Sequence, residues 1–70
     1  MVNIYPNPTK DFINIETGND KPLKFKIYNI SGYLIKTEYI ISKGTIDLSY
    51  LPAGVYFMES YGLKTKIIKY

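Results

Sequence analysis

The stretch that decides the fold covers residues 47–56 and has the sequence DLSYLPAGVY. It has the pattern of the end of one strand, a short corner and the start of another. Apolar and polar residues alternate up to Leu48, which is the period of a half-buried strand. Pro52 fixes its own φ and has no N–H to donate, so regular pairing ends there. Gly54 can take a positive φ, and the β-branched and aromatic run 55–58 follows it directly.

The sequence predicts where two side chains of this corner lie. Leu51 lies inside the corner and is predicted to drop into the core beneath it. Tyr56, second in the new strand, resembles the tyrosine of sandwich corners, whose hydroxyl bonds to backbone a few residues upstream. We therefore predict that the corner mainly fixes the fold, with direct contact to a partner as the alternative.

Outward from the corner, short apolar and alternating runs are separated by Gly, Pro, Asn and Asp. No segment has helical periodicity over eleven residues or more. Evenly spaced short strands of this kind are typical of an antiparallel sandwich or barrel. The predicted strands are Val2–Tyr5, Phe12–Glu16, Leu23–Tyr28, Tyr33–Ile41, Thr45–Leu48, Val55–Ser60 and Leu63–Tyr70.

The alternation also predicts which side chains face the core. Ile13 and Ile15 share one face of their strand. In the next strand the core-facing residues are Leu23, Phe25 and Ile27. The strand over residues 33–41 contains the pair Leu34-Ile35, which leaves its inward face open. We favour the row of Ile35, which also contains Tyr33, Thr37 and Tyr39.

Near the beginning of the chain, Pro6-Asn7-Pro8 ends the first strand. A residue before proline is pushed to extended geometry, so Tyr5 and Asn7 are both kept out of the helical region. A Pro-x-Pro segment stiffens the entry to the domain and protects an edge strand against foreign pairing.

Composition excludes several classes of function. The 70 residues contain no cysteine and no histidine, which removes thiol nucleophiles, Ser-His pairs and zinc clusters. The six acidic residues are spread singly, so we expect neither an enzyme nor a cofactor. All nine basic residues are lysine and the net charge is +3. Without arginine, and with scattered lysines, nucleic acid is not an expected partner. No apolar run approaches the ~20 residues of a membrane span.

Five motifs along the chain carry a resemblance to a known family. In order they are Ile4-Tyr5-Pro6-Asn7-Pro8, Phe12-Ile13-Asn14-Ile15, Ile27-Tyr28-Asn29-Ile30-Ser31-Gly32, Leu51-Pro52-Ala53-Gly54-Val55-Tyr56 and Lys66-Ile67-Ile68-Lys69. Each motif is weak alone, but their order and spacing are those of the family. The chain resembles the C-terminal sorting domain of type IX secretion cargo, from Ile4 to the last residue.

The resemblance implies an all-β fold, a small antiparallel immunoglobulin-like β-sandwich of about seven short strands. It implies a non-catalytic secretion signal at the C-terminus of a protein from a Gram-negative bacterium. The implied partners are the type IX outer-membrane translocon, a shuttle protein and a cell-surface sortase that cuts upstream of the domain. The parent would pass through the periplasm and end on the cell surface or outside the cell. We expect residues 1–70 to be one domain excised from that parent, with Met1 as an added start.

By the same resemblance, twelve residues match the motifs of the family. They are Pro6, Asn7, Pro8, Gly32, Leu51, Pro52, Gly54, Tyr56, Lys66, Ile67, Ile68 and Lys69. The terminal strand is a candidate recognition element, since an end strand offers free backbone groups for pairing with a partner, and the alternative is a plain solvated edge strand. Its lysines at 64, 66 and 69 were expected on the surface. Edge strands also leave self-association possible.

Two other functions remain open from the residues alone. An ancillary carbohydrate-binding module is possible because eight tyrosines could stack on sugars. However, Tyr28, Tyr33, Tyr39 and Tyr56 lie in predicted strands, where packing explains them. An adhesive immunoglobulin-like module is the other alternative.

Overall fold

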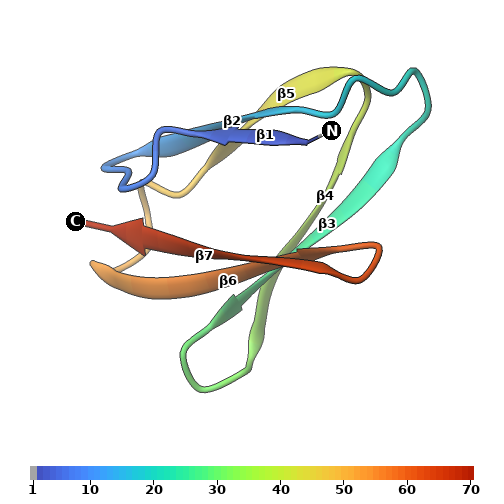
Figure 1. The fold of residues 1–70 in the computed structure, drawn as a ribbon. Coiled ribbons are helices and arrows are strands. Elements are labelled where there is room, and N and C mark those ends of the chain that lie inside the picture. Colours follow the sequence, from blue (N-terminus) through green and yellow to red (C-terminus); the bar gives the residue numbers. More distant parts are fainter. Residues whose placement is uncertain (1) are drawn as a thin grey trace.

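The computed structural model describes residues 2–70, which form seven strands and no helix (Figure 1). Within these residues no helix is long and apolar enough to cross a membrane. The predicted strands are all present, with ends shifted by one or two residues. The bounds are β1 Asn3–Tyr5, β2 Phe12–Glu16, β3 Leu23–Asn29, β4 Leu34–Ile40, β5 Lys43–Asp47, β6 Gly54–Ser60 and β7 Leu63–Lys69.

The strands form two antiparallel sheets that face each other (Figure 1). The first sheet has the order β1-β2-β5, and the second has the order β4-β3-β6-β7. The predicted all-β sandwich is therefore confirmed. In constant-type immunoglobulin domains the fourth strand pairs with the fifth. Here β4 pairs with β3 instead, which gives a three-stranded and a four-stranded layer.

The core lies between the layers and follows the period-two pattern of the strands. Cross-strand partners share a face, so Ile13 opposite Ile46, and Ile27 opposite Met58, point inward together. Leu23 packs against this core but is only partly buried. The buried apolar residues are Ile13, Ile15, Phe25, Ile27, Ile40, Ile46, Leu48, Tyr56, Met58 and Ile67.

The corner between β5 and β6 carries the chain from one sheet to the other. Tyr56 is buried, and its hydroxyl donates a 2.6 Å hydrogen bond to the carbonyl of Pro52. The N–H of Leu51 bonds to the carbonyl of Leu48, and the Leu51 side chain packs partly buried against the core. Gly54 has a φ of 155°, a value that residues with a Cβ rarely adopt. The corner thus fixes the crossing between the sheets, as its residues predicted.

The predicted inward face of β4 is wrong. Tyr33 and Tyr39 are 71% and 63% exposed, and Thr37 is exposed as well. Ile40 fills the core in their place. The cause is a register shift at the end of β3, where Tyr28 pairs with Leu34 while Ile27 pairs with Lys36. Ile35 is the extra residue of this bulge, so it contacts the core while the rest of its row faces outward.

Polar side chains occupy the inward face of β4 directly after the bulge. Lys36 and Glu38 lie opposite Ile27 and Phe25, and their charged groups pair at 3.3 Å. The Lys36 ammonium also donates to the carbonyl of Asp47, across the gap to the other sheet. Inward charges on an edge strand disfavour pairing with a foreign strand. The hydrogen bond from Lys36 to Asp47 also joins the two layers on the β4–β5 side.

Replacing Tyr56 by Phe tests the corner hydrogen bond without changing the packing of the ring. The change should lower the free energy of unfolding by about 1 kcal/mol, because the hydrogen bond from the Tyr56 hydroxyl to the Pro52 carbonyl is lost. In a domain of this size that corresponds to roughly 4–8 °C in thermal unfolding followed by circular dichroism.

Tyr39→Phe is the matched control, since the Tyr39 ring is exposed and its hydroxyl has no partner within residues 2–70. Equal melting temperatures for the two variants would show that the Tyr56 hydroxyl does not stabilise the corner.

Candidate recognition surface

The free edge of β7 is covered by the loop between β1 and β2. The side-chain amide of Asn7 accepts a 3.0 Å hydrogen bond from the N–H of Ile68. The same amide donates a 2.7 Å hydrogen bond to the carbonyl of Lys66. An amide side chain has the donor and the acceptor of a peptide group. Asn7 therefore pairs with β7 as one residue of a neighbouring strand would.

Thr9 extends this pairing with its backbone. Its N–H donates to the carbonyl of Ile68 at 2.8 Å, and its carbonyl accepts from the N–H of Tyr70 at 3.0 Å. Thr9 is buried, and its hydroxyl donates to the carbonyl of Phe12 in the next strand. We call residues 7–9 with 66–70 the clip. In Figure 1 the β1–β2 loop lies beside the end of β7, close to the C-terminus.

The clip changes the interpretation of the terminal strand. β7 is an edge strand, as expected, but the groups on the outer edge of its second half are paired. Along that edge, residues 64, 66 and 68 direct their backbone groups away from β6 by strand alternation. The open part is thus the first half, where no strand within residues 2–70 pairs beyond Lys64.

The side chains of β7 divide between its two faces. Lys64, Lys66 and Ile68 are exposed on the outer face, whereas Ile67 is fully buried. Lys69 is only 8% exposed and lies on the inward face, opposite Gly54. The expectation that Lys69 is a surface lysine is therefore wrong. The partner at this position has no side chain, which leaves room for a lysine stem on the inward face.

Eleven of the twelve motif residues gather at one end of the sandwich. Gly54, Val55 and Tyr56 pair with Lys69, Ile68 and Ile67, so the corner adjoins the clip directly. Gly32 lies apart, in the β3–β4 turn, with a φ of 90°. Asn29 closes that turn, because its side-chain oxygen accepts from the N–H groups of Ser31 and Tyr33.

Hydrogen bonds shift the pKa of two side chains, Asp47 and Tyr5. Hydrogen bonds from the hydroxyl and N–H of Ser49 hold the pKa of Asp47 below its usual range. A hydrogen bond to the Glu16 carboxylate raises the pKa of Tyr5. Within residues 2–70 no three acidic side chains come together as metal ligands. The clip and the outer side of β7 together form a shaped surface that could bind a partner.

The fold and the clip define a small all-β sandwich whose first loop is paired to its last strand. A family described as the secretion system C-terminal sorting domain matches residues 3–70. Because the match spans nearly the whole chain, the chain belongs to this family. No curated protein and no solved structure matches the chain.

Membership of the family gives the general function. The domain is a C-terminal secretion signal for type IX secretion, and it interacts with that machinery. It is a non-catalytic targeting module that directs export to the cell surface or the extracellular space.

The pairing role of Asn7 was not foreseen from the sequence. The Pro-Asn-Pro segment was expected to stiffen the entry to the domain and to protect an edge strand against foreign pairing, with no role given to the Asn7 side chain. Instead, the residue between the prolines covers a strand 59 to 61 residues further along the chain. The only signal in the sequence was a hydrogen-bonding side chain between two residues that lack an N–H.

Asn7→Asp tests the clip with almost no change in shape. A carboxylate can still accept from the Ile68 N–H, but it cannot donate to the Lys66 carbonyl. We expect the free energy of unfolding at pH 7 to fall by about 1–2 kcal/mol. The hydrogen bond to the Lys66 carbonyl is lost, and a carboxylate oxygen then faces that carbonyl oxygen with no proton between them.

Asn19→Asp is the control, because it makes the same change of charge at an exposed residue. The Asn19 side-chain oxygen accepts from the N–H of Lys21, as a carboxylate can, and no hydrogen bond donated by its amide is lost within residues 2–70. Urea unfolding measures both variants, and equal losses would indicate a charge effect without a clip.

Proposed function

We propose that the secretion machinery reads this domain as a folded unit, through the clip and the outer side of β7. One observation carries the proposal: segments 59 to 61 residues apart in sequence meet in a single hydrogen-bonded surface. An unfolded chain would separate these segments, so a receptor for this surface would select folded cargo.

The side chains around the clip suit such a role. Pro6, Pro8 and Lys66 are exposed, Ile68 is 38% exposed and Tyr70 is 67% exposed. Their backbone is held by the hydrogen bonds of the clip, so little conformational freedom would be lost on binding. The inward residues Ile67 and Lys69, like the corner residues Leu51, Pro52, Gly54 and Tyr56, would act through the fold. Gly32 would act through its turn.

In this proposal residues 1–70 form the last domain of a larger secreted protein. The parent passes through the periplasm, and the outer-membrane translocon binds the folded domain. A shuttle protein then carries it to a cell-surface sortase, which cuts before Met1 and attaches or releases the cargo. Self-association through edge strands stays a prediction, for which the first half of β7 is the candidate.

A reporter fusion tests the proposal. A signal peptide, a fluorescent protein, a short linker and Val2–Tyr70 are joined and expressed in a bacterium with an intact type IX system. Fluorescence should reach the cell surface or the medium. Deletion of Lys66–Tyr70 should hold the reporter in the periplasm, because it removes every partner of Asn7 and Thr9 along β7. Periplasmic retention of the intact fusion would contradict the proposal.

One double variant tests whether the machinery recognises the lysine charges or the shape of the surface. Lys64→Gln with Lys66→Gln removes two exposed charges and should leave folding within about 0.5 kcal/mol per site. Lys69 is kept, because it is buried. If this variant folds but is retained, the lysine charges are needed for export. Normal export would assign recognition to the backbone and the apolar side chains of the clip.

A further inference from the structure

The outer face of the four-stranded sheet has a net positive charge as large as that of the whole chain. By strand pairing this face presents Lys24, Lys26, Lys64 and Lys66, with Glu59 as its one acidic side chain. Its net charge is +3, equal to that of the chain, so the other lysines and acids balance. Within residues 2–70 the only ion pair joins Lys36 to Glu38. The lysines of the outer face are therefore available to a partner.

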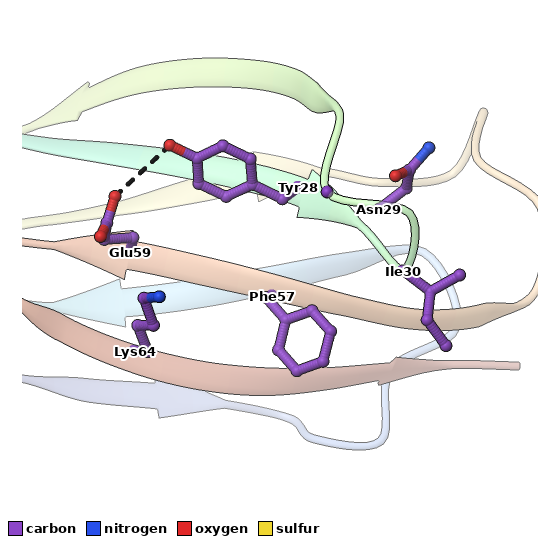
Figure 2. A pocket seen from close by; sticks show the side chains of 7 residues that line it. Tyr28, Asn29, Ile30, Phe57, Glu59 and Lys64 are labelled. Carbon is purple, nitrogen blue, oxygen red and sulfur yellow. Dashed lines mark hydrogen bonds between the residues drawn. The ribbon is translucent and has the colours of Figure 1, made fainter.

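An apolar groove lies next to these lysines. Lys64 lines it, and Lys26 and Lys66 lie opposite its residues Glu59 and Phe57 on the neighbouring strands. It has a volume of about 490 Å³ and is lined by Tyr28, Ile30, Phe57, Glu59 and Lys64, together with the turn residues Asn29 and Gly32. Figure 2 shows the Tyr28 and Phe57 rings between Ile30 at one end and the two charged residues at the other. Ile30 is 73% exposed and Phe57 is 37% exposed, so the lining of the groove presents apolar surface to a partner.

The polar end of the groove is already organised. The Tyr28 hydroxyl lies 3.4 Å from the Glu59 carboxylate and donates to it. Glu59 also lies between Lys26 and Lys64 on neighbouring strands. The two lysines more than balance the charge of Glu59, so the net charge at this end of the groove is positive.

We infer that this groove is a docking site for a protein segment of the type IX machinery, one that inserts an apolar side chain flanked by aspartate or glutamate. The inference rests on the proposed function and names the chemistry of the partner. A lysine rim around an apolar centre is complementary to an acidic rim around an apolar anchor. The site is continuous with the clip, because Phe57 pairs with Lys66 and Val55 pairs with Ile68.

Other occupants fit the groove less well. A second copy of the chain would bring two faces of charge +3 together, and these repel. An anionic lipid surface would attract the lysines but would leave a concave groove beside the β3–β4 turn unfilled. A protein side chain fills such a groove and meets the rim at the same time.

The test uses the purified chain with a fluorescent label. The probes are outer-membrane vesicles from a type IX-competent bacterium, vesicles from a strain lacking the translocon, and liposomes of its lipopolysaccharide. Both kinds of vesicle are opened by freezing and thawing, so that their periplasmic face is accessible. The chain should bind only the first, and binding should weaken as salt is raised. Phe57→Thr keeps a strand-forming residue and should weaken binding about tenfold or more. Lys26→Gln with Lys64→Gln should weaken it by roughly threefold to tenfold.

Matched controls make the same substitutions, one phenylalanine or two lysines, at positions outside the groove. Phe12→Thr changes an exposed phenylalanine of the other sheet. Lys21→Gln with Lys43→Gln gives the same net charge, and Lys43 lies opposite Glu16 as Lys64 lies opposite Glu59. These variants should bind like the original chain. Thermal unfolding confirms that each variant is folded.

The outcomes separate the inference from the proposed function. If the original chain binds the competent vesicles and is exported, but the groove variants match their controls, the docking site is wrong and the proposed function stands. Equal binding to lipopolysaccharide liposomes would make the occupant a lipid and overturn the inference. If the original chain neither binds nor is exported, the proposed function itself fails.

Discussion

The pairing of Asn7 with β7 is the interaction on which the completed sandwich depends. Two sheets in contact only through apolar side chains can slide, and strands at their edges keep unpaired backbone groups. The side-chain amide of Asn7 covers part of one such edge, and the backbone of Thr9 covers the next part. Since this loop belongs to the first sheet and β7 to the second, the same bonds hold the layers together. On the opposite side, Lys36 reaches the carbonyl of Asp47 and does the same.

These contacts matter because the chain is short. A domain of 70 residues buries a smaller share of its surface than a large domain does, and this one has no disulfide. Polar contacts at its margins therefore have a larger part in specifying one structure than they would in a large core. The corner adds to this, since the Tyr56 hydroxyl fixes the crossing next to the clip. One end of the molecule thus combines the fixed crossing, the paired terminal strand and the exposed side chains proposed for recognition.

Alternation and turn residues were sufficient to locate all seven strands and the corner. Those signals are local, and the core-facing residues of β2 and β3 followed from them directly. The wrong predictions concern residues whose environment is set by strands far away in the sequence. The face of β4 depends on a bulge set by its pairing with β3, and no residue near Ile35 specifies it. Lys69 is buried because its cross-strand partner is a glycine fifteen residues earlier. The role of Asn7 required knowing that β7 would lie beside it.

Amide hydrogen exchange along β7 is the most direct test of the clip. The N–H groups of Lys64, Lys66, Ile68 and Tyr70 all point to the same outer edge, but only the last two have acceptors there. Exchange measured by NMR on the folded chain should therefore be slow at Ile68, measurably slowed at Tyr70, and fast at Lys64 and Lys66. Equally fast exchange at all four amides would mean that Asn7 and Thr9 do not pair with the terminal strand, and would contradict the account.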